Sequence, residues 1–546
     1  MADPVAELRS AVEAAADALR DGNDAGASAP VLERPPKPEF GDYSTNAAML
    51  LAPALGEPPR GTAEKLAAEL GRALEGSLER VEVAGPGFLN LFLTDAWYRR
   101  AAAALAAQGD RLGKPAPEKA TERINIEFVS ANPTGPLTAA GGRHAAYGDS
   151  VARALEFVGH PVTREYYVND RGGQIDRFAE SIAARMKGEP VPEDGYEGDY
   201  VAGIARELQQ EGLDASDLDS LARRGVALMR AAIEETLHRY HVVYDTWSSE
   251  RALHESGAIE RALEEASRAD LVYESEGATW LRTTRFGDDK DRVLIRSDGD
   301  ATYFLSDVAY HREKLERGAD RLINVLGADH HGYPPRLRAA LASQGYDPDL
   351  LETPIMQLVH VVEGGERAQM SKRRGEFVTL DELIGDIGTD AARFFMLQRS
   401  HDTPVDLDLE LARRTSNENP VYYVQYAHAR IASILRKAGE GADERAASAD
   451  FDAAELAIEP SERALIKRLC ELPGEVAEAA SRRAPHRLCA YSTEVARDFH
   501  AFYRDCQVVG AEGGGVEESR LGLCLLTKRT IARTLGLLGI SAPERM

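Results

Sequence analysis

The stretch INIEFVSANPTGPLTAAGGR, residues 124–143, decides the fold of this chain. It opens with INIEFVS, which reads as a buried strand, and continues into a loop rich in Asn, Pro and Gly. The following HAAYGDSVARALEFVG, residues 144–159, has the apolar spacing of a helix. A strand, a tight loop and a helix in this order indicate one unit of a parallel α/β sheet.

The loop between this strand and helix is also a candidate ligand site. Small residues let the backbone approach a phosphate, and the start of a helix offers unpaired N–H groups to it. The pattern is neither GxGxxG nor GxxxxGK[ST], so it matches no standard phosphate loop. An anion or nucleotide site and an ordinary strand–helix turn both remain open at this point.

Downstream segments repeat the alternation of strands and helices. VTREYYVND and RLINVLGADHHG have strand-like patterns, VYESEGATWLRT with RVLIRSDG predicts a hairpin, and PPRLRAALASQG has a helical pattern. This predicts a doubly wound, Rossmann-type parallel sheet over residues 119–405, with ligands at the carboxyl ends of its strands. A mainly helical, acidic insertion is expected at about residues 176–290.

The two flanks of this domain differ in kind. Residues 1–118 combine a helix from Val5 to Leu19 with RVEVAGPGFLNLFL, which predicts strands joined by a tight turn, so a small α/β domain is expected. Residues 406–546 carry helical periodicity and predict an all-α bundle. The expected fold class is therefore α/β plus all-α, in three domains.

The charge balance restricts the kind of partner. The chain has 65 Lys and Arg against 90 Asp and Glu, a net charge of −25, which excludes a uniformly basic nucleic-acid coat but not a local basic groove. Only 11 of the cations are Lys. This balance favours a protein kept soluble in concentrated salt; an acidic protein from a GC-rich genome is the alternative.

Compartment signals point to the cytoplasm. Four cysteines, Cys470, Cys489, Cys506 and Cys524, form no CxxC pair, so buried free thiols are expected rather than a zinc or redox site. The first residues contain acids and no apolar core, so no signal peptide is expected. No run approaches eighteen apolar residues, so no membrane span is expected.

Two further loops carry polar groups that suit phosphate chemistry. QMSKRRG, residues 369–375, is cationic, and Lys372 could serve as a mobile charge on a migrating phosphate; a solvated surface loop is the alternative. GADHHG, residues 327–332, follows a strand directly. Its Asp and His donors are adjacent rather than at ligand spacing, so a substrate contact is expected there and no metal site.

Taken together, these motifs resemble the arginyl-tRNA synthetases of class I. PTGPLTAAGGR is similar to the first class I signature, and QMSKR is similar to the second. EFVSANPTGPL, EYYVNDRGGQI, GADHHGY, NPVYYVQYAHARI and the terminal LLGISAPERM narrow the resemblance to the arginine enzymes. The resemblance covers the whole chain, and the order of its motifs is specific.

The resemblance implies an activity and its partners. Such an enzyme condenses L-arginine with ATP, as its Mg²⁺ complex, and transfers arginine to the 3′ end of tRNA(Arg). Bound tRNA usually supports the activation step. The leading domain would contact the tRNA corner and the bundle its anticodon. A cytoplasmic monomer without a tightly held metal is expected, from a salt-adapted archaeon.

The resemblance also assigns residue roles. The family's arginine-pocket positions are occupied here by Glu127, Ser130, Asn132, Tyr303 and Asp307. These residue types suit the ligand, because a guanidinium is bound best by carboxylates and planar hydrogen bonding. A core aromatic is the alternative for Tyr303. Thr138, Gly141 and Lys372 are the catalytic candidates. The ATP-binding candidates are Pro133, Thr134, Gly135, Gly142, Arg143, Gly327, Asp329, His330, Met370 and Ser371.

One departure from the family pattern is large. The first signature usually carries His at both ends, whereas here it reads Thr138-Ala139-Ala140-Gly141, and Gln369 replaces the usual leading Lys of the second. Arg143 or His144, further along the helix, could replace the missing donors. The departure leaves an alternative open, a catalytically impaired paralogue that regulates by binding tRNA or an amino acid. A different nucleotidyl transferase would leave both flanking domains unexplained.

Overall fold

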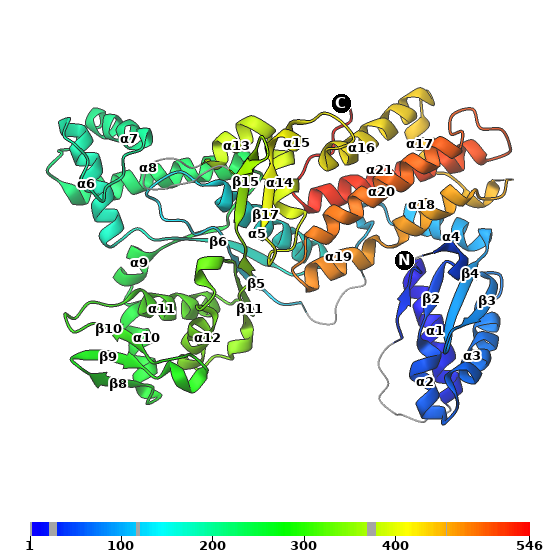
Figure 1. The fold of residues 1–546 in the computed structure, drawn as a ribbon, viewed down its shortest axis with the longest axis horizontal. Helices are drawn as coiled ribbons and strands as arrows, with labels where there is room; N and C mark the ends of the chain where they lie inside the picture. Colours follow the sequence, from blue (N-terminus) through cyan, green and yellow to red (C-terminus); the bar gives the residue numbers. More distant parts are fainter. Residues whose placement is uncertain (1–2, 21–29, 36, 116–120, 368–377, 455) are drawn as a thin grey trace.

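The central element of the computed structural model is a five-stranded sheet in the order β13-β11-β5-β6-β7, with every neighbouring pair parallel. The structure describes residues 3–20, 30–35, 37–115, 121–367, 378–454 and 456–546. The strands are β5 (Ile124–Glu127), β6 (Val162–Val168), β7 (Thr246–Ser249), β11 (Arg321–Asn324) and β13 (Leu351–Glu352). The predicted parallel sheet is confirmed, and Figure 1 shows it at the middle of the molecule.

Helix α5 (Ala139–Val158) follows β5 and packs tightly against it. A Cβ placed on Gly148 would lie 2.2 Å from the ring of Phe128, so only glycine allows this close approach. Thr138 caps the helix, because its hydroxyl oxygen accepts a hydrogen bond from Gly141 N at 3.2 Å. The strand, loop and helix therefore form as the quoted stretch predicts.

Strand β7 lies inside the stretch that we expected to be a continuous insertion, residues 176–290. Helices α6 (Gly173–Lys187), α7 (Asp199–Gln210) and α8 (Leu218–Arg239) do leave the sheet, but β7 returns to its edge beside β6. The four residues of β7 read TWSS and are only half-buried. Such a short, polar edge strand lacks the apolar run by which strands are recognised in a sequence.

The chain then builds a small lobe around a three-stranded antiparallel sheet, β10-β9-β8. Figure 1 shows this lobe in green below the parallel sheet. Further strands continue the main domain up to β17, which crosses the expected boundary at residue 405. The elements are α9 (Glu250–Glu255), α10 (Ala258–Arg268), β8 (Val272–Ser275), β9 (Ala278–Leu281), β10 (Arg292–Ile295), α11 (Tyr303–Glu316), β12 (Leu326–Gly327), α12 (Pro334–Ser343), β14 (Ile355–Met356), β15 (Val359–Glu363), β16 (Glu366–Arg367), α13 (Leu380–Ile387), α14 (Thr389–Leu397), β17 (Val405–Asp408) and α15 (Leu409–Arg413).

The N-terminal region is a four-stranded antiparallel sheet with helices, as expected from its sequence. The tight turn at Gly85–Gly87 joins β3 to β4 in the predicted hairpin. The elements are α1 (Pro4–Arg20), β1 (Leu32–Glu33), β2 (Tyr43–Thr45), α2 (Ala47–Leu55), α3 (Pro59–Ala73), β3 (Leu78–Ala84), β4 (Phe88–Leu93) and α4 (Asp95–Ala106).

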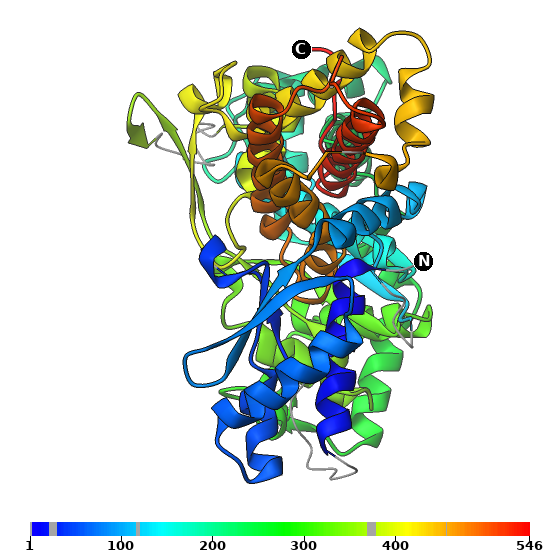
Figure 2. The same ribbon diagram turned by 90° about the vertical axis from the view of Figure 1, so that its right-hand side faces the viewer.

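The C-terminal region is a bundle of helices, and the N-terminal region docks onto it (Figure 2). Lys467 of α18 pairs with Asp42 at 2.9 Å, and Arg463 pairs with Asp95 at 2.6 Å. All four cysteines are buried free thiols within the bundle. The helices are α16 (Pro420–Lys437), α17 (Ala442–Ala447), α18 (Pro460–Cys470), α19 (Leu472–Ser481), α20 (His486–Asp505) and α21 (Val516–Leu537).

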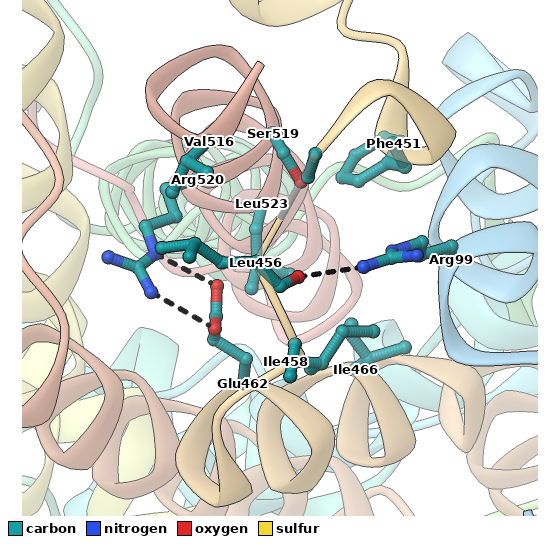
Figure 3. Close-up of a pocket in the computed structure, with 12 residues that line it drawn as sticks. Arg99, Phe451, Leu456, Ile458, Glu462, Ile466, Val516, Ser519, Arg520 and Leu523 are labelled. Atoms are coloured by element: carbon teal, nitrogen blue, oxygen red, sulfur yellow. Dashed lines mark hydrogen bonds and ion pairs between the residues drawn. The ribbon is translucent and has the colours of Figure 1, made fainter. Parts of the chain in front are cut away.

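A small cavity of about 30 Å³ lies at this junction, between α4, α18 and α21. Figure 3 shows the Arg520–Glu462 ion pair on one side of it and Arg99 donating to the carbonyl of Leu456 on the other. Its volume suits about one water molecule. None of its lining residues comes from the parallel sheet, so it belongs to the packing of the two flanking regions.

Candidate active site

Acidic and polar side chains gather where the parallel strands end. Glu127, the last residue of β5, accepts a hydrogen bond from Lys314 Nζ at 2.5 Å and another from Ser130 Oγ at 2.9 Å. Lys314 comes from α11, is buried, and also donates to Asn324 at the end of β11. Because parallel strands present their carboxyl ends at one edge, residues from distant segments meet there.

Three more carboxylates, from Asp170, Glu250 and Asp307, join Glu127 around the hydroxyl of Tyr167. Burial, together with the charges of Glu127 and Glu250, raises the pKa of Asp307 to about 7, against the lowering effects of the Tyr333 hydroxyl and of Lys314. Burial likewise raises the pKa of Glu250 to about 7. Lys314 already supplies a positive charge to Glu127, so a further cation would act mainly on Asp307 and Glu250, whose ionised forms are disfavoured by burial.

The other expected arginine contacts lie around the same edge. Tyr303 opens α11 one turn before Asp307 and is 53% exposed, so it is not the core aromatic that was considered as an alternative. Its hydroxyl faces Gly172, where a Cβ would lie 3.1 Å away. Asn132 is exposed and donates to Gln174 at 2.6 Å.

Two members of the acidic cluster, Asp170 and Glu250, were missed from the sequence. Asp170 follows β6 by two residues in the motif YYVND, and its place after a strand could have revealed it. Glu250 follows β7 directly, but β7 itself carries no recognisable strand pattern. Glu250 therefore had no signal in the sequence that would place it at the sheet edge.

The start of the signature helix is joined to the segment that follows QMSKRRG. Ala139 N donates to Val378 O at 3.0 Å and Leu380 N donates to Leu137 O at 2.8 Å, around a bridge between Thr138 and Thr379. Met370, Ser371 and Lys372 lie outside the described residues. The pairing places residues 378–380, which follow that segment in the sequence, directly beside Thr138.

The loop before the helix is closely packed. Pro133 and Thr134 are buried, and a Cβ on Gly135 would lie 3.1 Å from the hydroxyl of Tyr200. A Cβ on Gly142 would lie 2.7 Å from Leu380, so Gly142 serves the packing of α5 against α13. This packing accounts for glycine at position 142, and the expected ATP contact there stays a prediction.

Arg143 does not face the ligand side of the helix. It is 1% exposed, and its guanidinium donates to the carbonyls of Gln357, Ser400 and Thr403, each at 2.8 Å. These carbonyls occupy the guanidinium, so the expected ATP contact by Arg143 does not fit this arrangement. The residue instead ties α5 to the loops at 357 and 400–403.

His144 lies on the side of α5 that faces the GADHHG loop. Burial and the charge of Arg143 lower its pKa to about 4, while Asp329 opposes the shift. A Cβ on Gly327 would lie 3.7 Å from His144 Cε1 and 2.5 Å from Asp329 Oδ1. The side chains of Asp329 and His330 are exposed and 3.5 Å apart. A neutral imidazole thus lies beside the open loop where ATP contacts were expected.

Comparisons with known proteins identify the family of this chain. The chain is 44% identical over 530 residues to the arginine–tRNA ligase of Shouchella clausii (strain KSM-K16), covering 94% of each protein. The chain belongs to the arginyl-tRNA synthetase family. Residues 6–93 match the arginyl-tRNA synthetase N-terminal domain, residues 207–431 the class I (R) catalytic domain, and residues 424–546 the DALR anticodon binding domain.

Solved structures agree with this assignment. The arginyl-tRNA synthetase of Thermus thermophilus superposes with a TM-score of 0.77 at 26% identity, over 99% of each chain. A Campylobacter jejuni protein described as an arginyl-tRNA synthetase has a TM-score of 0.76 at 33% identity, over 83% of this chain and all of that one.

The function of the chain follows from its membership of this family. The chain is an arginine–tRNA ligase, a class I aminoacyl-tRNA synthetase, so L-arginine, ATP and tRNA are its substrates. Nothing in the comparisons supports the impaired paralogue. Among the described helices, none has the length and apolar composition needed to cross a bilayer.

Proposed function

We propose that Glu127, Glu250 and Asp307, three members of the acidic cluster, bind the guanidinium of L-arginine. ATP would lie between this cluster and the start of α5. The observation that carries the proposal is the pair of buried carboxyl groups with raised pKa values at the sheet edge. A guanidinium offers five donors in a planar fork and would add a positive charge beside Asp307 and Glu250, while Lys314 pairs with Glu127. Ser130, Asn132 and Tyr303 line the approach to this cluster.

The affinity for arginine should depend on pH. The pKa values of Asp307 and Glu250 are about 7 without arginine, so both carry protons below that pH. The guanidinium favours their ionised forms, so binding releases protons and tightens as the pH rises from about 6 to about 8. Calorimetry in two buffers of different ionisation enthalpy measures the release. An affinity that stays constant over this range, without proton release, would contradict the assignment.

The ATP phosphates would meet a site without the usual signature histidines. Thr138 keeps one hydroxyl donor, while its oxygen caps the helix. Gly141, the loop Pro133–Gly135 and the loop of Gly327, Asp329 and His330 complete the proposed ATP site, with His144 as the neutral imidazole that faces it. Lys372, with Met370 and Ser371, would stabilise charge on the transferring phosphates, and Mg²⁺ would enter with ATP.

The tRNA would be bound by both flanking domains, residues 1–118 and 406–546, around the catalytic domain at 119–405. In the bundle, Tyr422 and Tyr426 stack with their ring centroids 6.1 Å apart. Arg430 lies over Tyr426 and Tyr503, with its guanidinium carbon 5.8 Å and 4.7 Å from the two ring centroids. Half-buried aromatic rings beside an arginine form a surface on which unpaired bases can stack.

Tyr426→Ala tests this surface. Loss of one stacking ring should weaken tRNA(Arg) binding about tenfold to a hundredfold, while the KM values for arginine and ATP stay unchanged. Filter binding measures the tRNA affinity. Tyr273→Ala is the matched control, because Tyr273 also stacks on a neighbouring aromatic ring but lies in the lobe of β8–β10. Equal tRNA affinity in Tyr426→Ala and the parent protein would exclude Tyr426 from the interface.

The acidic surface suits a salt-rich cytoplasm, and we expect the protein to be a monomer from a salt-adapted archaeon. Charging of tRNA(Arg) with tritiated arginine, in dilute and in molar KCl, tests the salt adaptation and the ligase function. We expect charging to persist in molar KCl, because stacking and base-edge contacts lose less than phosphate contacts when salt rises. Charging confined to dilute salt would contradict salt adaptation, whereas no charging at any salt would contradict the ligase function.

A further inference from the structure

The loop between Glu127 and the signature helix is held by three tyrosine hydroxyls. Tyr244 Oη donates to the carbonyl of Phe128 at 2.9 Å, Tyr166 Oη to that of Ala131 at 2.9 Å, and Tyr200 Oη to that of Thr134 at 2.7 Å. The three carbonyls recur at every third residue. The backbone is thus fixed at its start, middle and end.

This loop has a conformation that its own residues disfavour. Val129 has a φ of 68° and Ser130 a φ of 40°, in the left-handed region that β-branched residues rarely adopt. Such a backbone costs free energy and persists only where surrounding contacts hold it. Ser130 needs this conformation, because its hydroxyl donates to Glu127 and accepts from Tyr167 N at 3.1 Å.

The three tyrosines come from different elements. Tyr166 lies in β6 and stacks on Trp247, with ring centroids 4.5 Å apart; Tyr244 contacts Phe128 in the same aromatic cluster. Both are buried and fixed by this packing. Tyr200 belongs to α7, in the helical excursion between β6 and β7, and is only half-buried. Burial still raises its pKa, so its hydroxyl keeps its proton and remains a donor.

We infer that Tyr200 is a positioning residue through which the helices between β6 and β7 set the affinity for both arginine and ATP. It acts on the strained loop rather than on a reacting atom. One end of that loop carries Glu127 and Ser130, and the other end leads into Thr138 and Gly141. The inference therefore rests on the arginine and ATP sites proposed above.

Tyr200→Phe removes the hydroxyl and keeps the ring that packs over Gly135 and Gly198. We expect the KM values for arginine and for ATP each to rise about three- to tenfold in tRNA-supported pyrophosphate exchange, as for one lost neutral hydrogen bond. The tRNA dissociation constant should stay within about twofold, and the melting temperature should be nearly unchanged because Tyr200 is half-buried.

Tyr491→Phe is the matched control. The hydroxyl of Tyr491 also donates to a backbone carbonyl, that of Arg468 at 3.0 Å, but it is buried in the bundle. We expect this variant to lose some stability and to keep both KM values. Tyr166→Phe removes a second hydroxyl from the loop and should reproduce the KM changes, with a larger loss of stability.

Two results would overturn the inference. Unchanged KM values in Tyr200→Phe would show that the hydroxyl does not position the loop. Parallel losses in kcat, stability and tRNA affinity would show a general structural role. Glu127→Gln tests the proposed arginine site independently of Tyr200. If that site is wrong, Glu127→Gln also leaves the KM for arginine unchanged.

Discussion

Asp307→Asn should raise the KM for arginine by about 10²–10³ and leave the KM for ATP nearly unchanged. The carboxyl of Asp307 lies beside Glu127 and Glu250, and the guanidinium of arginine is the cation that we propose for this cluster. An amide keeps the size of the side chain but loses the charge, so the bound guanidinium loses a charge-assisted partner. Pyrophosphate exchange at varied arginine concentration measures the effect.

The stability of Asp307→Asn distinguishes lost binding from damage. The pKa of Asp307 is raised from its ordinary value to about 7 in the folded protein, so its contribution to stability is present at low pH and is lost as the pH rises through about 7. The substitution should therefore not lower the melting temperature at pH 8. Asp320→Asn, in an exposed ion pair with Arg123, is the control and should change neither quantity. A KM for arginine that matches the parent protein would remove Asp307 from the pocket.

Lys372→Ala should lower the rate of arginyl-adenylate formation by about 10²–10³, with tRNA affinity nearly unchanged. Catalysis of this transfer is mainly electrostatic, and a mobile ammonium group can follow the charge on the phosphates. The hydrogen bonds at residues 137–139 and 378–380 bring the end of this loop to the signature helix, which supports its access to ATP. Single-turnover adenylate formation in the presence of tRNA(Arg) measures the effect.

Because the first signature lacks its histidines, the effect of Lys372→Ala should be larger than in a chain that keeps them. Thr138 and His144 are the remaining donors proposed near the phosphates, so a larger share of the charge stabilisation should depend on Lys372. Lys290→Ala, an exposed lysine in the lobe of β8–β10, is the control and should keep full activity. An equal loss of adenylate formation and tRNA affinity in Lys372→Ala would refute its assigned role.

The elements that were predicted well have strong local patterns. Strand β5 reads INIE and is buried at its first three residues, and α5 follows it after a loop of Asn, Pro and Gly. Strand β7 was missed because TWSS at a sheet edge is short, polar and half-buried. Arg143 was assigned to ATP, yet its side chain points into the protein, because α5 is buried on most of its surface and its orientation depends on its neighbours.

The order of its motifs is enough to recognise the family from the sequence alone, since each signature is a contiguous segment with its own spacing. The tertiary structure alone decided which carboxylates form the acidic cluster that we propose as the arginine site. Glu127, Asp170 and Glu250 follow three separate strands, and only the parallel pairing of those strands brings them to one edge beside Asp307. Burial at that edge, together with the charges of Glu127 and Glu250, raises the pKa of Asp307, and no spacing along the chain encodes that effect, because electrostatic energy depends on distance in space.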